Sequence, residues 1–560
     1  MVVMKGKEAL VKNLQVEGVE YIFGNPGTTE SPIIDELTKC SNSGIEYILV
    51  LQEGVAIGIA DAYSRLSNKP TFLNLHIETG LGNAVSLLHN VFETGTSMVL
   101  SAANKDIREL THGMTDLTDV VKPFTKWSIE ASMPEQIPFS IRRAFNEARK
   151  VPTGPTFISF TANALDHDAE MEILPPDEAP SYGYPDKDAI ESAANILMQA
   201  NNPIFLLGDK VGNLKAVSEV VRLSEISGSK VYAMEYSEMN FPTDHSQYFG
   251  KLRLGYKEDQ SIISEADVIF VIGKITSGYF MFSNPSLRYF NEQSTLIHLD
   301  NDSNEIGKSQ KTNIPILGDI KLSISNLNVA IQSLMSSKTQ KIINQRISTL
   351  KAKKQELIKV WTNDLLSKWD CNPMSPERMM SEISKFVKEA PGTILINDAV
   401  SSQSALFGSI NFNREKSILG GFGGAIGWGV GAGIGAKLAN PESPVLAILG
   451  DGTAMMTVQG FWTASSYKIP VVYIICNNSS YRVLKINMEY YRQHILNQSD
   501  AVDSQIGADF PGGLDIASMA SAMGVKSKRI TDPSEIKDSI HWAFSLGEPV
   551  VLDIVIDNQY

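Results

Sequence analysis

The sequence predicts an α/β protein built from three doubly wound parallel-sheet domains. Short apolar runs bounded by turn residues alternate with helix-length segments along most of the 560 residues, a pattern typical of parallel sheets that are covered by helices on both faces. Two interruptions, one rich in proline and acidic residues and one long, charged and helical in pattern, divide this alternation into three blocks. At roughly 150 residues per domain, the length also fits three or four domains.

The first block, residues 1–175, contains four runs that we expect to be buried strands, because each is short, continuous and bounded by turn residues. These runs are residues 45–51, 70–76, 97–103 and 155–161. Helical segments such as 55–67 and 138–149 lie between them. The segment 172–188 follows, and its proline, glycine and acidic residues are typical of a linker.

The second block, residues 188–335, repeats the alternation, with strands expected at 203–209, 229–234, 267–273 and 295–302. A charged helical stretch over about 336–369 is then expected to bridge the surface. The third block, residues 370–560, has strands expected at 393–399, 445–449, 471–476 and 549–556. We therefore predict three α/β domains of similar size.

The composition excludes some classes of function. With 43% hydrophobic and 20% charged residues, it is that of an ordinary folded protein. The net charge of −14 argues against nucleic acid or an anionic membrane surface as the main partner. The three cysteines, Cys40, Cys371 and Cys476, form neither a disulfide framework nor a CxxC metal motif and fit a reducing compartment. The charged N-terminus does not resemble a signal peptide, so we expect a cytoplasmic protein.

One uncharged stretch, residues 417–436, is long enough to span a bilayer. It is rich in glycine and therefore only weakly apolar, so we do not expect a membrane span. Its GxGxxA-like spacings follow no clear strand, so we do not expect a dinucleotide site there either.

Two strands of the third block each end in small side chains that carry oxygen. Asp451 follows the strand 445–449, and Asn478 follows the strand 471–476. A helix-length segment, 454–468, lies between them, and such a crossover places both strands parallel in one sheet. Both side chains are then expected at the carboxyl edge, where open α/β sheets bind ligands. Oxygen ligands of this kind suit Mg²⁺ or Ca²⁺.

The glycines beside Asp451 indicate a phosphate group. Gly450 and Gly452 let the backbone approach closely, and a helix that begins near Thr453 offers free N–H groups and the positive end of its dipole. Gly-Asp-Gly alone is most often a turn, and Asn-Asn alone is most often a loop. Their spacing across one strand–helix–strand unit favours a metal-bridged phosphate site instead.

Together with three N-terminal motifs, this pattern resembles the thiamine-diphosphate-dependent enzymes. The motifs are FGNPGTTE (residues 23–30), LQEGVAIGIADAYSR (51–65) and NLHIETGLGNA (74–84). The resemblance covers essentially the whole chain and is closest to the benzoylformate-decarboxylase-like 2-oxo acid decarboxylases. It implies thiamine diphosphate (ThDP) and Mg²⁺ as cofactors. It also implies the domain order pyrimidine-binding (PYR), middle and diphosphate-binding (PP).

The resemblance assigns the cofactor contacts. Asp451 and Asn478 match the family's metal ligands through their side chains, and Ser480 matches the third through its backbone carbonyl. The Gly424 carbonyl would bind the pyrimidine amino group, and Ile426 would bend the cofactor. The remaining positions that match cofactor-binding residues are Asn397, Ser401, Gly450, Gly452, Thr453 and Tyr481.

Three residues of the PYR domain are candidates for catalysis. Glu53 begins a helix, where a glutamate is favoured by roughly 0.3–1 kcal/mol, but its apolar neighbours indicate a buried carboxyl that could share a proton with a ring nitrogen. In the family this glutamate holds the aminopyrimidine. His76 could be a structural histidine, and it matches the active-site acid or base of benzoylformate decarboxylases. Thr28 either caps a helix or contacts the substrate carboxylate, as a serine does in those enzymes.

The sequence departs from the family pattern at two positions, Phe280 and Glu78. Phe280 occupies the place of a second active-site histidine, which puts decarboxylation of benzoylformate itself in doubt. His112 could substitute for that histidine, or it could lie in a surface loop. Glu78 could favour a polar or cationic substrate, or it could point away. The stretch 271–282 also lacks the arginine and acids with which acetolactate synthases contact FAD, so FAD is not expected.

The leading prediction is a carbon–carbon lyase that decarboxylates a 2-oxo acid, aromatic or branched, to an aldehyde without oxidation. A carboligase that forms or cleaves 2-hydroxyketones, acetolactate-synthase-like or benzaldehyde-lyase-like, shares every motif and stays open. A non-catalytic scaffold is disfavoured because Glu53, Asp451 and Asn478 are all present. The resemblance implies a homodimer or homotetramer with the active site at the subunit interface. We also expect residues 479–507 to cover the site.

Overall fold

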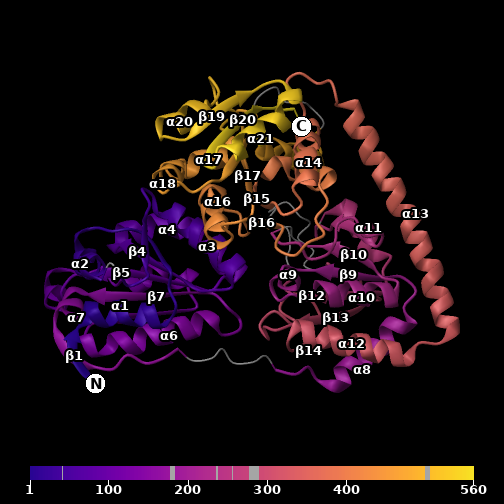
Figure 1. Ribbon diagram of the computed structural model, residues 1–560. Helices are drawn as coiled ribbons and strands as arrows, with labels where there is room; N and C mark the ends of the chain where they lie inside the picture. The colour runs from indigo at the N-terminus through magenta and orange to yellow at the C-terminus, as the bar shows by residue number, and fades with distance from the viewer. Residues whose placement is uncertain are drawn as a thin grey trace.

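The computed structural model describes residues 1–40, 42–176, 183–234, 237–254, 256–275, 289–498 and 505–559. Within these ranges it contains three six-stranded sheets and one two-stranded antiparallel sheet, formed by β1 (Val2–Lys5) and β8 (Asp168–Met171). The strands of each six-stranded sheet run parallel, and helices flank the sheets (Figure 1). The predicted class of three doubly wound α/β domains is confirmed.

The N-terminal domain is built on a sheet whose interior strands are continuous apolar runs. In sheet order, its strands are β3 (Glu46–Leu49), β2 (Tyr21–Asn25), β4 (Thr71–His76), β5 (Met98–Asn104), β7 (Pro155–Thr161) and β6 (Trp127–Ala131). Every residue of β5 and β7 is buried, as expected for strands covered on both faces. The flanking helices include α1 (Gly6–Val16), α3 (Glu53–Ser67), α4 (Ile77–Thr94) and α6 (Ile137–Arg149).

The middle domain has its own parallel sheet and is joined to the C-terminal domain by a long helix. In sheet order, the strands are β11 (Tyr248–Lys251), β10 (Lys230–Ala233), β9 (Pro203–Leu207), β12 (Val268–Ile272), β13 (Thr295–Asp300) and β14 (Ile314–Leu317). The flanking helices include α8 (Lys187–Gln199), α10 (Val217–Ser227) and α12 (Ile320–Leu334). Helix α13 (Ser337–Ser367) then runs along one side of the molecule (Figure 1), where the charged stretch predicted a bridging helix.

The C-terminal domain repeats the strand order of the N-terminal domain. In sheet order, its strands are β16 (Ile418–Gly420), β15 (Ile394–Asp398), β17 (Val445–Gly450), β18 (Val472–Asn477), β20 (Val550–Val555) and β19 (Lys526–Ile530). Its helices include α16 (Trp428–Ala439), α17 (Asp451–Met456), α18 (Gly460–Ser466) and α19 (Arg482–Tyr490). Strand β2 lies beside β4 in the N-terminal sheet, and β15 lies beside β17 in the C-terminal sheet. The loops that follow these strands therefore occupy equivalent places at the carboxyl edges of the two sheets.

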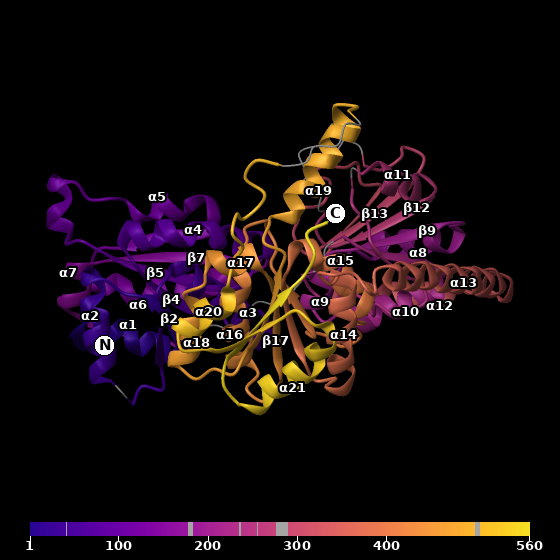
Figure 2. The same ribbon diagram turned by 90° about the horizontal axis from the view of Figure 1, so that it is seen from above.

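Helix α3 of the N-terminal domain crosses helix α16 of the C-terminal domain at close range (Figure 2). A Cβ atom on Gly431 would lie 2.5 Å from the carbonyl oxygen of Val55, and one on Gly435 would lie 2.0 Å from that of Ile59. Only glycine lets two helix backbones approach this closely. This packing therefore fixes the two domains against each other.

The uncharged stretch 417–436 is part of this junction. It contains β16 and most of α16, and residues 428–436 are all buried. The stretch therefore belongs to the core between two domains. Across the described parts of the chain, no helix has both the length and the apolar character that crossing a membrane requires.

Candidate active site

The catalytic candidates of the N-terminal domain lie at the carboxyl edge of its sheet. Strand β4 ends at His76, and helix α3 begins at Glu53 shortly after β3. Thr28 opens the short 3₁₀ helix Thr28–Glu30, which follows β2. Because neighbouring parallel strands end at one edge, the three residues are brought to the same side of the sheet.

Glu53 is buried and held by two side-chain amides. Its side chain accepts a hydrogen bond from Asn25 at 3.1 Å and another from Asn83 at 2.9 Å, and the residue is only 4% exposed. The amide donors come from the end of β2 and from α4. Since each carboxylate oxygen can accept more than one bond, Glu53 keeps acceptor capacity for a further donor.

His76 is oriented by a buried glutamate that the sequence analysis did not single out. The Nδ1 atom of His76 lies 2.7 Å from Oε2 of Glu30, whose side chain is fully buried. The same carboxylate accepts hydrogen bonds from the backbone N–H groups of Gly27 and Ala103, each at 2.9 Å. A carboxylate only accepts, so the contact places a proton on Nδ1 and leaves the Nε2 atom of His76 for a ligand. Glu30 could have been found from the sequence, because it is the acidic residue that ends the FGNPGTTE motif.

The backbone around His76 is shaped to fit the imidazole. A Cβ atom on Gly27 would lie 2.1 Å from Nδ1 of His76, so only glycine fits at this position. Ile77, which follows the histidine, has a φ of +38°. Positive φ is strained for a β-branched residue, and such strain persists only where the surrounding structure holds it.

The metal-ligand candidates meet at the carboxyl edge of the C-terminal sheet. Asp451 follows β17, and its Oδ2 atom accepts a hydrogen bond from the backbone N–H of Ser479 at 2.6 Å, which joins the ends of β17 and β18. Its Oδ1 atom accepts from the N–H of Gly452 at 2.7 Å. Asn478 is also buried and accepts from the N–H of Ser480 at 3.1 Å. The predicted strand–helix–strand unit thus brings these residues together.

This donor set fits a hard divalent cation. Asp451 is 3% exposed, and burial raises the pKa of its carboxyl to about 6, although backbone hydrogen bonds partly offset this rise. A nearby cation would favour the ionised form. The oxygens of Asp451, Asn478 and the Ser480 backbone are of the type that Mg²⁺ binds, with phosphate and water completing its shell.

The other diphosphate-site candidates surround this edge. Gly452 leaves no room for a side chain, because a Cβ atom there would lie 2.5 Å from Cε1 of Tyr481. Gly450 caps α17, and Thr453 is buried within that helix. Two further candidates lie at the end of β15, where Asn397 is buried and Ser401 is half-buried.

The loop 421–427 carries the pyrimidine-contact candidates and is held from several sides. Gly424 has a φ of +92°, which a residue with a side chain rarely adopts, and half-buried Ile426 follows it. Asn90 of α4 donates to the carbonyl of Ala425 at 2.8 Å and accepts from its N–H at 3.1 Å. Thr457 donates to the carbonyl of Gly427 at 2.6 Å.

Asp398, like Glu30, is a buried carboxylate that the sequence analysis did not single out. It ends β15 and accepts a hydrogen bond from the backbone N–H of Gly429 at 2.8 Å, at the start of α16. Burial raises its pKa to about 7, although three backbone hydrogen bonds oppose the rise. Asp398 therefore anchors α16, and with it the end of the loop 421–427, to the sheet.

The remaining candidates lie apart from these groups or outside the described residues. His112 ends the 3₁₀ helix Ile107–His112, and its side chain is 77% exposed. Phe280 lies outside the described residues. Glu78 lies in the first turn of α4, where its Oε2 atom is buried and accepts no hydrogen bond from any described residue. Residues 479–507 were expected to cover the site. The structure describes this segment except for residues 499–504, and α19 lies within it.

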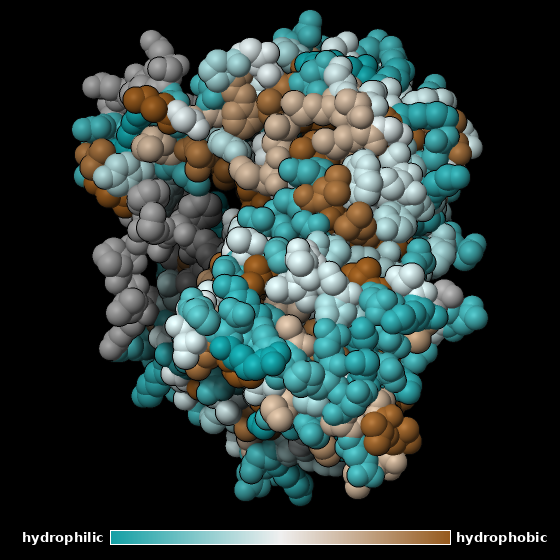
Figure 3. Space-filling model, turned by 90° about the vertical axis from the view of Figure 1, so that its left-hand side faces the viewer, coloured by the Kyte–Doolittle hydropathy of each residue, from teal (hydrophilic) through white to brown (hydrophobic). Residues whose placement is uncertain are grey.

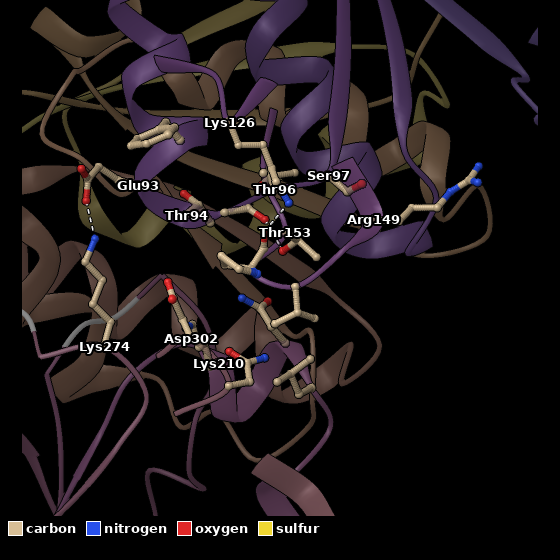
Figure 4. Close-up of a pocket in the computed structure, with 18 of the residues that line it drawn as sticks. Glu93, Thr94, Thr96, Ser97, Lys126, Arg149, Thr153, Lys210, Lys274 and Asp302 are labelled. Atoms are coloured by element: carbon tan, nitrogen blue, oxygen red, sulfur yellow. Dashed lines mark hydrogen bonds and ion pairs between the residues drawn. The ribbon is translucent and has the colours of Figure 1, made fainter. Parts of the chain in front are cut away.

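A cavity of about 690 Å³ lies between the N-terminal and middle domains (Figure 4). Residues 92–97 and 149–154, which precede β5 and β7, form one wall. Lys210, Lys274 and Asp302, which follow strands of the middle sheet, line the other, and Lys274 forms an ion pair with Glu93 at 2.6 Å. The cavity faces the amino edge of the N-terminal sheet, so it is separate from the edge that carries His76.

Three family models match consecutive parts of the chain. The N-terminal TPP binding domain of the thiamine pyrophosphate enzymes matches residues 4–122, where thiamine pyrophosphate (TPP) is another name for ThDP. Their central domain matches residues 190–327, and their C-terminal TPP binding domain matches residues 398–554. The order is the one that the resemblance implied.

Named relatives align over nearly the whole chain. The probable acetolactate synthase large subunit of Methanocaldococcus jannaschii is 30% identical over 99% of this chain and 92% of its own length. The benzoylformate decarboxylase of Pseudomonas aeruginosa is 24% identical over 97% of each chain.

Solved structures share the fold across all three domains. The ThDP-dependent 4-hydroxybenzoylformate decarboxylase of Rhodococcus jostii has a TM-score of 0.82 at 23% identity, covering 99% of each chain. The benzoylformate decarboxylase of Polynucleobacter necessarius has a TM-score of 0.82 at 24% identity, with the same coverage. Together with the three consecutive domain matches and the full-length relatives, the two carboxyl-edge groups show that this chain belongs to the family of thiamine-diphosphate-dependent enzymes.

Proposed function

We propose that this enzyme uses ThDP and Mg²⁺ to decarboxylate a 2-oxo acid, aromatic or branched, to an aldehyde. The observation that carries the proposal is the imidazole of His76, which buried Glu30 of the 3₁₀ helix Thr28–Glu30 orients at the same sheet edge as Glu53. Decarboxylation without oxidation needs an acid that returns a proton to carbon, and an oriented histidine can supply it. The benzoylformate decarboxylase among the named relatives supports this reading.

Each residue has a role that its geometry supports. ThDP, when bound, supplies the electron sink for the electron pair that CO₂ leaves behind. Asp451, Asn478 and the Ser480 carbonyl would hold Mg²⁺, and Glu53 would share a proton with the aminopyrimidine. The hydroxyl of Thr28 would contact the substrate carboxylate. The Nε2 atom of His76 would then exchange a proton with the reacting carbon or oxygen.

A carboligase is the second candidate function. It is favoured by the names of the relatives, since the M. jannaschii protein that is 30% identical is described as a probable acetolactate synthase large subunit. The cofactor-binding groups would serve both reactions equally. The reactions differ in whether a proton or a second carbonyl compound takes up the electron pair.

We also propose that the active site forms between subunits. Apolar side chains are exposed close to both carboxyl edges: Leu51 (48%) beside Glu53, Val400 (48%) after β15, and Met456 (46%) at the end of α17. On the face in Figure 3, hydrophobic residues gather in the upper half, over the C-terminal domain. Exposed apolar surface of this kind is typical of contact sites. A monomeric mass in solution with full activity would refute a subunit-interface site.

The decisive experiment supplies a panel of 2-oxo acids with ThDP and Mg²⁺, measures CO₂, and identifies the products by mass. Glu53→Gln removes the proposed proton-sharing carboxyl, and Glu46→Gln at the exposed start of β3 is the matched control. CO₂ with a free aldehyde, lost only in Glu53→Gln, is the expected result. CO₂ with a hydroxyketone would instead establish the carboligase. No CO₂ from any acid would refute the decarboxylase and the acetolactate-synthase-like carboligase, and aldehydes would then test the benzaldehyde-lyase-like reaction.

A further inference from the structure

One turn of helix α3 contacts both ends of the loop 421–427. Arg65 donates a hydrogen bond through Nη1 to the carbonyl of Gly420 at 3.0 Å, directly before the loop. Asp61 accepts a hydrogen bond at 2.8 Å from the indole N–H of Trp428, directly after the loop. Asp61 and Arg65 are four residues apart, so they lie on one face of the helix. Their side chains form an ion pair at 3.3 Å and are almost fully buried.

The same arginine also contacts the middle domain. Its Nη2 atom donates to the carbonyl of Ser237 at 2.7 Å and to Oε1 of Glu238 at 2.8 Å. Its Nε atom donates to the same Glu238 oxygen at 3.1 Å. The N–H of Gly420 also donates to the Ser237 carbonyl at 2.9 Å. Arg65 therefore fixes the start of the loop against two other domains at once.

The loop itself has little intrinsic shape. Four of its seven residues are glycine, and Gly423, Gly424 and Gly427 have φ values of +107°, +92° and +103°. Glycine loses more conformational freedom on ordering than any other residue, so such a loop needs external contacts to hold one conformation. The cluster on α3 supplies them at both ends, and Asn90 of α4 supplies them in the middle.

We propose that Asp61 and Arg65 are positioning residues that hold the loop 421–427 in the conformation that binds the cofactor pyrimidine. The inference rests on the proposed function and on the contacts of Gly424 and Ile426 with that ring, which the family resemblance implies. A loop held in its bound shape loses less freedom when the ligand binds, so it binds the ligand more tightly. Helix α3 thus has two roles, because its first residue is Glu53 and its third turn holds the loop.

Two variants separate this role from general stability. Trp428→Phe removes the indole N–H that links Asp61 to the end of the loop, together with one ring of a buried side chain. Thr96→Val is the control for the Asp61 carboxylate, because the Thr96 hydroxyl donates to its other oxygen at 2.5 Å. Trp428→Phe also leaves a cavity and should lower Tm more than Thr96→Val, so the two variants are compared by ThDP affinity and by local hydrogen exchange.

The measurement is the dissociation constant of ThDP by titration calorimetry in saturating Mg²⁺. We expect Trp428→Phe to weaken ThDP binding about tenfold, the scale of one hydrogen bond to a charged group, and Thr96→Val to change it by less than about twofold. Equal dissociation constants for the two variants would overturn the positioning role. If the wild-type protein bound no ThDP, the proposed function itself would fail.

A second measurement tests the positioning role without the cofactor. Hydrogen exchange of the backbone amides in residues 420–428 is followed in the cofactor-free wild type and in both variants. We expect exchange in this segment, relative to exchange of amides elsewhere in the protein, to be faster for Trp428→Phe than for Thr96→Val. Equal protection of the segment in both variants would refute the inference even if the wild type binds ThDP.

Discussion

Replacing Glu30 by glutamine tests whether the carboxylate behind His76 serves catalysis. Glu30 is fully buried and receives donors from Gly27, Thr29 and Ala103 in addition to its contact with the imidazole. Glutamine keeps the length and one oxygen but replaces the other oxygen with an NH₂ group. The charge that favours a proton on Nδ1 of His76 is then lost, while the packing of the site is preserved.

Two effects of this change can be given a magnitude from the structure. The NH₂ group would face a buried donor, and an unsatisfied donor costs about 1–3 kcal/mol of folding free energy. A charge-assisted hydrogen bond is worth about 1.5–3 kcal/mol, which corresponds to roughly a 10- to 100-fold loss of kcat if it acts in the rate-limiting step. The first effect lowers Tm, and the second lowers activity.

The assay is CO₂ release at saturating substrate, ThDP and Mg²⁺, with Tm measured on the same samples. Glu36→Gln is the control, because Glu36 of α2 (Ser31–Lys39) is also buried in the N-terminal domain but contacts Cys40, the residue that follows this helix. We expect Glu30→Gln to lose kcat and Glu36→Gln to retain it. If Glu30→Gln kept kcat within about threefold while its Tm fell, the carboxylate would be purely structural and the reasoning would be refuted.

Three further predictions concern Asp451, Asp398 and the ion pair between Lys274 and Glu93. Asp451→Asn should abolish Mg²⁺-dependent ThDP binding in calorimetry, as EDTA should in the wild type, because it removes the negative charge from the proposed metal site. For Asp398, whose pKa is raised from 3.8 to about 7, the contribution of this carboxyl to wild-type stability should fall as pH rises from about 4 to 7. Asp398→Asn should remove this dependence, so its Tm relative to wild type should increase across that window and level off above it; a constant difference would contradict this. Lys274→Met breaks the ion pair between Lys274 and Glu93, whose side chains are 28% and 24% exposed, and should destabilise the protein by less than about 1 kcal/mol; a larger loss would show that this contact holds the domains together.

The interior of the fold was predictable from sequence because buried parallel strands are continuous apolar runs. The runs at 97–103 and 155–161 correspond closely to β5 and β7, both wholly buried. Most edge strands were missed, although the edge strand β3 was predicted and the interior strand β2 was not. Strand β19, with the sequence KSKRI, is mostly polar and buries only its last residue, so it lacks the apolar signal of a strand covered on both faces. Strand β16 is apolar and buried, but its three residues are too few to mark a strand.

The site was predictable where the candidate ligands lie within one strand–helix–strand unit, because the connection between the strands fixes where their ends meet. The ends of β17 and β18 were placed together because one crossover connects them, and the hydrogen bond from Ser479 to Asp451 joins them in the structure. The contacts of Arg65 could not be predicted, because its partners Glu238 and Gly420 lie in other domains. No local pattern specifies which buried charges meet across a domain junction. Whether His112 is exposed was left open as well, because the residues around it show no hydrophobic periodicity from which its burial could be predicted; its side chain is exposed in the structure.

The two halves of the site differ in how their buried carboxylates are satisfied. In the N-terminal half, Glu53 is held by two side-chain amides and Glu30 by backbone amides and an imidazole. In the C-terminal half, Asp451 accepts from backbone amides, and its pKa is raised by burial. A carboxylate in that state is stabilised most by a cation. The N-terminal half is therefore formed by the fold alone, whereas the proposed Mg²⁺ would complete the C-terminal half, and the contacts of α3 with the loop 421–427 connect the two domains that carry these halves.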